Sequence, residues 1–225
     1  MKILIGNRNY STWSLRPWLV LVHFDIDFDD ELLQLSGPRW RETLHERSPT
    51  GKVPVLIDDD LVVPETIAII EYLADKFPDK AIWPQSMAER ALARAASAEM
   101  HAGFLALRSN APMNLRASHP GKVALDVVAQ DLHRIETLLG GLLARSGGPF
   151  LFGHFCAADA MYAPLATRLR TYELPMSDVL NEYVEAIYGL PAFQAWRAEA
   201  LKEPWILDDD EIDVIQGTVS RGTLA

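Results

Sequence analysis

The feature that most constrains the fold is a change of hydrophobic pattern about one third of the way along the chain. Before residue 79, short apolar runs typical of strands alternate with stretches of helical spacing, whereas only helical spacing remains after residue 86. The intervening stretch contains Pro84 and has no clear periodicity. We therefore expect the 225 residues to form an α/β domain over 1–79, a linker over 80–86 and an all-helical domain over 87–225.

The first of these domains reads as a βαβ unit, a connection and then a ββα unit. Strands are expected over 2–5, 28–35, 53–57 and 61–63, with helices that begin near residues 14 and 65. Pro17 fits only the first turn of a helix, so the first helix should begin close to Ser14. The acidic centre of the 28–35 strand favours an edge position in the sheet.

The second domain is predicted to contain five helices. Two long amphipathic helices, over 87–107 and 123–143, should pair with each other. Three shorter ones are expected over 157–172, 178–188 and 192–201. The acidic stretch from 208 and the Gly-, Ser- and Thr-containing end to 225 predict a surface-bound or loose tail.

Composition excludes several classes of protein. With 21 Lys and Arg against 31 Asp and Glu, the net charge of −10 disfavours nucleic acid and anionic membranes as partners. No stretch approaches the roughly 18 apolar residues of a membrane span, so we expect a soluble protein. The single cysteine, Cys156, fits a reducing compartment, so we expect the cytoplasm. The 6 histidines lack metal-site spacing, so no metal is expected. No dinucleotide, P-loop or hydrolase motif is present, so the sequence does not support those functions.

The segment between the first strand and the first helix is the first candidate site. Ser11, Thr12 and Ser14 offer hydroxyl groups at the carboxyl end of a strand, where the following helix also has unpaired N–H groups. These groups together could stabilise a bound anion. Alternatively, Ser14 caps the helix, and Ser11 and Thr12 are ordinary turn residues.

Two further segments favour a ligand with a peptide backbone. Pro54 at the start of a strand is predicted to follow a cis peptide bond, which would leave the backbone of Val53 free to pair with a bound peptide. Glu65 and Thr66 open a helix and suit the ammonium and carboxylate of an α-amino acid. Alternatively, Pro54 is an ordinary edge-strand proline, and Glu65 and Thr66 only form a favourable helix start.

Together these segments resemble the cytosolic glutathione transferase family, and the similarity covers nearly the whole chain. The matching motifs are Ser11-Thr12-Trp13-Ser14-Leu15-Arg16, Gly51-Lys52-Val53-Pro54 and Glu65-Thr66-Ile67-Ala68-Ile69. The first is similar to the Ser-x-x-Ser-x-Arg segment of the serine-type, zeta-like classes. The resemblance implies a thioredoxin-like N-terminal domain that binds glutathione, an all-α helical-bundle C-terminal domain that contributes the electrophile site, and a homodimer.

The resemblance also implies roles for individual residues. Ser11 matches the hydroxyl that donates a hydrogen bond to the glutathione sulfur. Val53 would pair with the cysteinyl backbone, Glu65 and Thr66 would hold the γ-glutamyl group, and Lys52 is a candidate for the glycine carboxylate. Tyr10 and Ser14 remain alternatives to Ser11 as the sulfur contact.

The chain departs from the family pattern in two places. Trp13 stands where the zeta pattern usually has a cysteine, which weakens the transfer of zeta isomerase activity to this chain. Cys156 stands at the first position of a capping box, where Asp159 is still expected to accept backbone N–H groups.

The second substrate is expected to lie against the helical domain. Met100, His101, Phe104 and Arg108, on one predicted helix, could line its pocket, or could be ordinary packing and surface residues. The leading functional hypothesis is detoxification-type transfer of glutathione to an electrophile. The alternatives are cis-trans isomerisation of a maleylacetoacetate-type diacid and a noncatalytic glutathione-binding or regulatory module.

Overall fold

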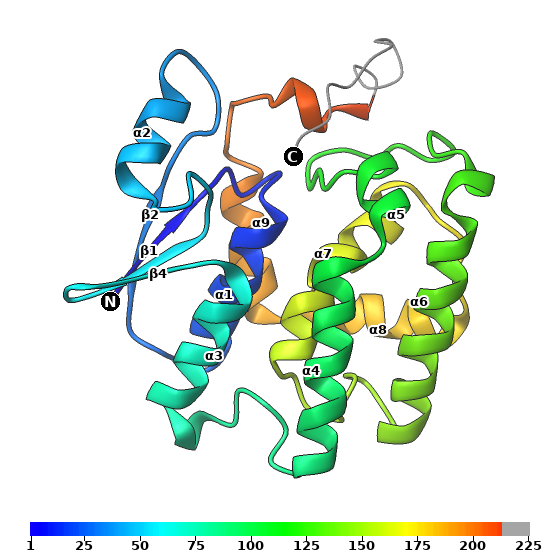
Figure 1. The fold of residues 1–225 in the computed structure, drawn as a ribbon. Coiled ribbons are helices and arrows are strands. Elements are labelled where there is room, and N and C mark those ends of the chain that lie inside the picture. Colours follow the sequence, from blue (N-terminus) through cyan, green and yellow to red (C-terminus); the bar gives the residue numbers. More distant parts are fainter. Residues whose placement is uncertain (213–225) are drawn as a thin grey trace.

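A computed structural model of the chain describes residues 1–212 (Figure 1). Its N-terminal part contains one mixed sheet with the strand order β2-β1-β3-β4. The strands are β1 (Lys2–Ile5), β2 (Asp29–Leu32), β3 (Val55–Asp58) and β4 (Leu61–Pro64). Because β1 pairs with β2 in parallel and with β3 antiparallel, the predicted βαβ and ββα units join into one sheet. The predicted edge position of β2 is confirmed.

Helices cover both faces of this sheet. Alternate residues of β1 and β3 point to opposite faces. Leu4 and Val55 pack in a small core with Leu44 of α2 (Trp40–Arg47), whereas Ile3 and Leu56 belong to the main core with α1 (Thr12–His23) and α3 (Thr66–Lys76). The sheet therefore separates α2 from the rest of the molecule (Figure 1). No sequence pattern predicted α2, because Leu44 is its single buried residue and no apolar stripe marks it.

The first helix begins two residues earlier than expected, at Thr12, so Pro17 lies in its second turn rather than its first. Proline has no N–H, and the carbonyl oxygen of Trp13 therefore lacks its usual helical donor. The hydroxyl of Thr66 donates to this oxygen at 3.0 Å. The contact makes Pro17 compatible with a helix interior and joins the beginnings of α1 and α3.

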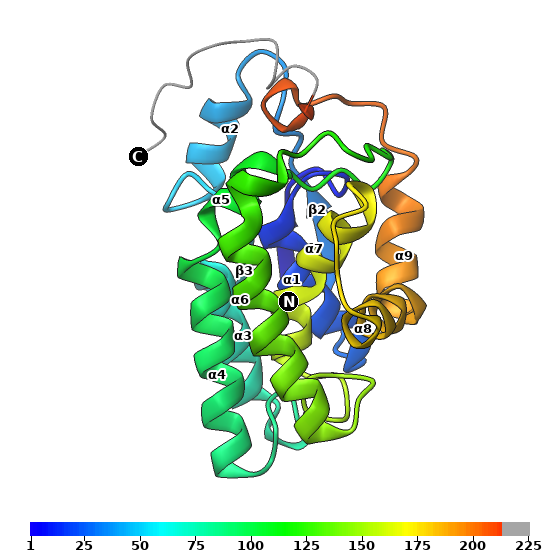
Figure 2. The ribbon, with the colours of Figure 1, turned by 90° about the vertical axis from the view of Figure 1, so that its right-hand side faces the viewer.

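The second part of the described chain is helical, as predicted, with α7 at its centre (Figure 2). The helices are α4 (Met87–Ala102), α5 (Leu105–Asn110), α6 (Leu125–Ser146), α7 (Ala157–Thr171), α8 (Asp178–Gly189) and α9 (Pro191–Ala200). All residues of α7 except Arg170 are buried, and the helix packs against α1, α4 and α8. Two short 3-10 turns, Pro78–Lys80 and Asp208–Asp210, precede α4 and follow α9.

The predicted helix over 87–107 is wrong in one respect, because it is broken into α4 and α5. Gly103 ends α4 in an extended conformation, and Phe104 adopts a left-handed φ of 57° before α5 begins. His101 and Arg108 therefore lie on different segments rather than one helix. Of the two segments, α5 packs against α6, whereas α4 meets α6 through a bidentate ion pair between Glu99 and Arg134.

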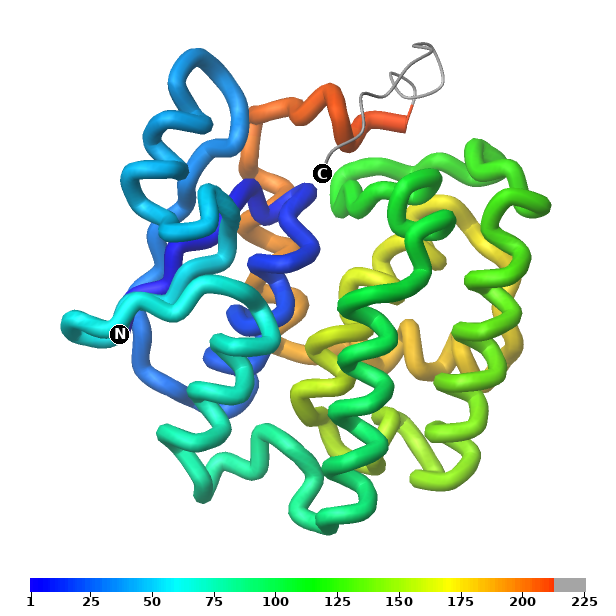
Figure 3. Tube along the Cα trace, in the orientation of Figure 1, coloured from blue at the N-terminus to red at the C-terminus, as the bar shows by residue number. Residues whose placement is uncertain are grey.

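After α9 the chain returns to the N-terminal domain (Figure 3). Glu203 accepts hydrogen bonds from the backbone N–H groups of Arg8 and Asn9, and Glu211 accepts one from the hydroxyl of Tyr10. The beginning of the predicted tail is thus bound to the surface, and its residues 213–225 lie outside the described part. Among residues 1–212, none of the helices combines the length and hydrophobicity needed to cross a lipid bilayer.

Candidate functional site

Three segments that are distant in the sequence meet at the beginning of α1. A Cβ atom built on Gly6 would lie 3.2 Å from the Cβ of Ser11 and 3.0 Å from a methyl group of Val53, so both residues flank this glycine. The bond between Thr66 and the Trp13 carbonyl brings the beginning of α3 to the same place. The structure therefore brings together the three segments that the sequence singled out.

Ser11 precedes α1 but does not use its hydroxyl to cap the helix. Its Oγ instead donates to the Oγ of Ser14 at 2.8 Å, and Ser14 also accepts from the N–H of Gly6 at 3.0 Å. Ser11 is partly exposed, whereas Ser14 is completely buried. Of the two serines, Ser11 is the one that a ligand can reach.

Tyr10 is directed away from Ser11, into a network with the C-terminal segment. Its hydroxyl donates to Glu211 and accepts from Arg116 at 2.9 Å. Burial, reinforced by the Glu211 carboxylate, raises the pKa of Tyr10 above its ordinary value. Because both partners form hydrogen bonds with the phenol hydroxyl, Tyr10 has a structural role in this loop.

The loop before β3 presents an unpaired backbone. The Val53–Pro54 peptide bond is cis, in agreement with the sequence-based expectation. Within residues 1–212, the N–H and C=O groups of Val53 have no hydrogen-bond partner. The hydroxyl of Ser48 donates to the carbonyl of Lys52 at 2.6 Å, and the side chain of Lys52 is exposed. Val53 can therefore accept an added backbone segment, with an ammonium group beside it.

Glu65 caps α3 from an unusual backbone conformation. Its φ of 80° lies in the left-handed region, which non-glycine residues rarely adopt and which is common at functional sites. One carboxylate oxygen accepts from the N–H groups of Ile67 and Ala68, and the other lies 2.9 Å from Nε2 of His101. Thr66 is buried and its hydroxyl is bound to Trp13, so it can offer only its backbone to a ligand.

The indole of Trp13 connects the two domains. The guanidinium carbon of Arg16 lies 4.1 Å from its ring centroid and that of Arg108 lies 4.9 Å away. The ring of His101 approaches the same indole at a centroid distance of 5.1 Å. His101 and Arg108 of the predicted pocket thus lie beside the segment that carries Ser11. Met100 and Phe104 are buried in the main core.

Three arginines form one cluster of positive charge, and two of them, Arg16 and Arg108, contact Trp13. Arg16 and Arg168 are buried, and Arg108 is partly buried. Burial is the main cause that lowers the pKa of Arg16, and repulsion by the other two arginines adds to it. Burial and repulsion by Arg108 lower the pKa of Arg168 to about 10, and burial alone lowers the pKa of Arg108. Guanidinium groups remain protonated at neutral pH even so. Within residues 1–212, no carboxylate forms a salt bridge with any of the three.

Their hydrogen bonds go to neutral backbone carbonyls. Arg16 donates to Met161, Arg108 to His101 and Gly103, and Arg168 to Pro164. Nη1 of Arg16 and Nε of Arg168 have no partner in the described part of the chain. Buried donors without partners are uncommon, and a cluster of like charges favours a bound anion. Arg168 was not predicted from the sequence, where its signal is a lone charge in the mostly apolar stretch 160–169.

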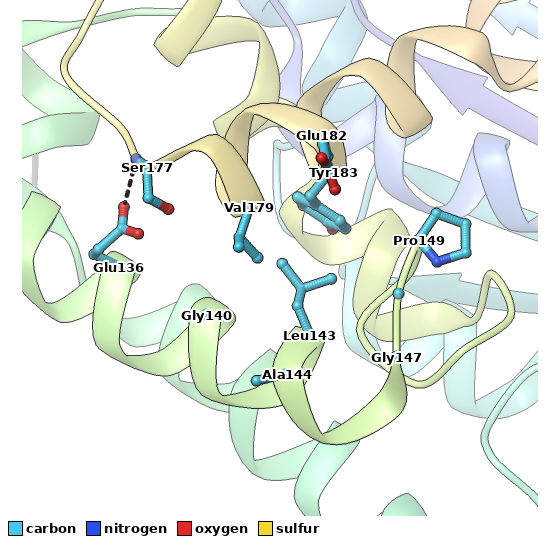
Figure 4. Close-up of a pocket in the computed structure, with 11 residues that line it drawn as sticks. Glu136, Gly140, Leu143, Ala144, Gly147, Pro149, Ser177, Val179, Glu182 and Tyr183 are labelled. Atoms are coloured by element: carbon cyan, nitrogen blue, oxygen red, sulfur yellow. Dashed lines mark hydrogen bonds between the residues drawn. The ribbon is translucent and has the colours of Figure 1, made fainter.

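One pocket lies elsewhere, in the helical domain (Figure 4). It has a volume of about 340 Å³ and lies between α6, the loop that follows it and the beginning of α8. Glu136, Val179 and Tyr183 are among its lining residues, and none of the residues singled out from the sequence reaches it. In the described part of the chain, no three His, Cys, Asp or Glu side chains form a group that could hold a metal ion.

The chain is similar to several known proteins. Residues 10–76 match the family model for the glutathione S-transferase N-terminal domain. A probable maleylacetoacetate isomerase of Caenorhabditis elegans is 29% identical over 195 residues, which cover 84% of this chain and 88% of that protein.

Two solved structures share the fold. The first is a glutathione transferase homologue from Burkholderia with bound glutathione (TM-score 0.70, 23% identity, 88% of this chain and 97% of that one covered). The second is a bacterial zeta-class maleyl pyruvate isomerase (TM-score 0.69, 20% identity, 91% of this chain and 99% of that one covered). Residues 10–76 thus match a glutathione S-transferase N-terminal domain, and the thioredoxin-like sheet with its helical second domain is the fold of the cytosolic glutathione S-transferases.

Proposed function

We propose that this protein is a glutathione transferase in which the Ser11 hydroxyl stabilises the glutathione thiolate for attack on a small electrophile. The observation that supports this most directly is the accessible position of that hydroxyl: it is partly exposed, precedes α1 and does not cap the helix. A free thiol has a pKa of about 8.5 and is mostly protonated at neutral pH. A hydroxyl donor and the N-terminus of α1 both favour the thiolate, which is the nucleophile.

The remaining glutathione contacts are assigned to groups of the neighbouring segments. Val53 can pair its free N–H and C=O with the cysteinyl backbone. The Glu65 carboxylate can accept a hydrogen bond from the γ-glutamyl ammonium, and the Thr66 backbone N–H can donate to the γ-glutamyl carboxylate. Lys52 is exposed and can reach the glycine carboxylate. These assignments make glutathione a co-substrate held mainly by the N-terminal domain.

The arginine cluster favours a second candidate function, the cis-trans isomerisation of a small diacid of the maleylacetoacetate type. Here the thiolate adds to one carbon of the double bond, and the electron pair moves toward the conjugated carbonyl. Rotation about the resulting single bond follows, and expulsion of the thiolate restores the double bond in the trans form. Arg16, Arg108 and Arg168 supply cationic donors that suit the carboxylates of such a substrate.

Replacing Ser11 by alanine tests the proposed thiolate site. Ser11→Ala should lower turnover of a chromogenic electrophile about tenfold or more while changing glutathione affinity little, because the hydroxyl acts on the sulfur rather than on the peptide. Thiolate absorbance upon glutathione binding and calorimetry measure the two effects. If turnover and thiolate absorbance were unchanged, the sulfur contact would have to be another group.

The two reactions and the noncatalytic alternative can be separated with the wild-type protein. A transferase consumes one glutathione per product, whereas an isomerase converts the diacid without a net loss of glutathione. A binding module would show neither turnover nor thiolate absorbance.

We also propose a cytoplasmic, detoxifying homodimer, in which the exposed Leu61 and Val62 of edge strand β4 are available for contact with a second copy. Light scattering measures that assembly.

A further inference from the structure

The buried hydroxyl of Ser14 has no role in the proposed reaction and is the starting point for a further inference. Ser14 is completely buried in the first turn of α1, and within residues 1–212 its oxygen has two hydrogen-bond neighbours. The N–H of Gly6 donates to it at 3.0 Å, and the hydroxyl of Ser11 donates to it at 2.8 Å. The Ser14 proton itself is therefore not needed for either contact.

The backbone around these two serines is fixed. The N–H of Ser11 donates to the carbonyl of Asn7 at 2.8 Å, and the carbonyl of Ser11 accepts from Leu15. Gly6 has no room for a side chain, since an added Cβ would lie 2.6 Å from a methyl group of Leu35. The distance between the two hydroxyl oxygens is thus set by the end of β1 and the first turn of α1, and only their protons can reorient freely.

A serine hydroxyl has one donor and two acceptor sites. When a thiolate lies beside Ser11, the Ser11 proton has a better, charged acceptor than Ser14. If the Ser11 proton turns to the sulfur, the Ser11 oxygen becomes free to accept a hydrogen bond. The otherwise uncommitted Ser14 proton can then be donated to it, since the two oxygens lie 2.8 Å apart. The Gly6 N–H continues to hold the Ser14 oxygen throughout.

We propose that Ser14 is a positioning residue for catalysis, which donates its proton to Ser11 and so aims the Ser11 proton at the glutathione sulfur. The resulting chain runs from the Gly6 N–H through Ser14 and Ser11 to the thiolate. Each donor in such a chain polarises the next, so Ser14 strengthens a hydrogen bond that it does not itself make. This inference rests on the proposed function, because it requires Ser11 to contact the sulfur.

The test measures the pKa of enzyme-bound glutathione from its thiolate absorbance as a function of pH. Ser14→Ala should raise that pKa by about 0.5 to 1 unit and lower turnover at a pH below it about three- to tenfold. Ser14→Thr retains a hydroxyl and should restore both values. Ser97→Ala is the matched control, since Ser97 is also buried and helical but donates to the Ala93 carbonyl; it should change neither.

A double-mutant cycle with Ser11→Ala separates a positioning role from a structural one. In the Ser11→Ala background, Ser14→Ala should leave the bound thiol pKa unchanged, because Ser14 acts through Ser11 alone. An equal rise in both backgrounds, or no rise in the single variant, would overturn the proposal. Wild-type protein that forms no thiolate would instead contradict the proposed function itself.

A second substitution keeps the proposal testable if Ser14→Ala does not fold. Ser14→Cys nearly preserves side-chain volume, but a thiol is a weak hydrogen-bond donor. Its effect is read from the pH dependence of turnover, so that absorbance of the new cysteine does not interfere. A pH profile identical to that of the wild type would overturn the role of the Ser14 proton.

Discussion

At the scale of single residues, Glu65 joins two elements of the candidate site through one carboxylate. One oxygen caps α3, the other meets His101 of α4, and the backbone is held at a positive φ that costs free energy. Strain of this kind persists only where surrounding contacts determine the conformation. At Glu65 these contacts leave the carboxylate, 45% exposed, close to the beginning of α1, where an ammonium group of a ligand can meet it.

Replacing Glu65 should therefore affect glutathione binding more than catalysis. Glu65→Ala should weaken glutathione affinity about ten- to a hundredfold, since a charge-assisted hydrogen bond to the ammonium is lost. Calorimetry measures that affinity. Thermal unfolding should show an additional loss of about 1 kcal/mol from the missing helix cap.

Glu65→Gln is the matched control for the cap. Its amide oxygen can still accept from Ile67 and Ala68, so the stability of α3 should be preserved while the negative charge is removed. Glutathione should then bind weakly to a protein of normal stability. Wild-type affinity in both variants would contradict the placement of the γ-glutamyl group.

At the scale of elements, α7 shows how a buried helix depends on its first turn. Asp159 is completely buried and accepts from the N–H groups of Leu151 and Cys156 at 3.0 and 2.9 Å, which confirms the expected role of this carboxylate. Burial is the larger effect and raises the pKa of Asp159 from 3.8 to about 6, although both N–H groups favour the charged form.

The raised pKa predicts how stability depends on pH. Between about pH 4 and about pH 6, the folded state binds the Asp159 proton more tightly than the unfolded state does. The contribution of this group to the free energy of unfolding should therefore fall as pH rises through that window, by about 3 kcal/mol. Denaturant unfolding of wild type and Asp159→Asn at several pH values measures it, because the other carboxylates cancel in the difference. A difference that stays constant or grows with pH would contradict the prediction.

The elements also show what the sequence could and could not predict. Helices α7, α8 and α9 agree with their predicted ranges to within a residue at every end, because each is strongly apolar and has a clear stop. Helix α2 lacks such a stripe, and the break at Phe104 depends on a left-handed residue that is not glycine. Local patterns therefore predicted these strongly apolar helices, and missed a helix without an apolar stripe and a break set by a single backbone angle.

At the scale of the whole molecule, both ends of the described chain shape the loop that carries Ser11. The indole N–H of Trp196 donates to the carbonyl of Arg8, and Glu203 accepts from the N–H groups of Arg8 and Asn9. These contacts span more than 180 residues, so no local pattern could have indicated them. The Ser11, Val53 and Glu65 segments were recognisable in the sequence as motifs, whereas the arginine cluster and this C-terminal contact required the fold.

Charge is the other property of the whole molecule that matters for a substrate. The net charge of −10 repels a diacid, whereas Arg16, Arg108 and Arg168 attract it locally. Partly buried charges are screened less by water and salt than exposed ones, so the local cluster should decide binding. Arg108→Gln should lower kcat/KM for a maleyl-type diacid about ten- to a hundredfold, and much less for a neutral electrophile.

Arg94→Gln is the matched control for charge. It removes one positive charge from the molecule, but Arg94 is exposed on α4 and pairs with Glu71, away from the cluster at Trp13. If the overall field governed binding, both variants would lose diacid turnover to a similar extent. If the cluster governs diacid binding, only Arg108→Gln will lose diacid turnover. Glutathione affinity, measured by calorimetry, should stay within about twofold of wild type in both variants, since the proposed glutathione contacts come from the N-terminal domain. An equal loss for diacid and neutral electrophile in Arg108→Gln would assign Arg108 to the packing of Trp13 rather than to substrate recognition.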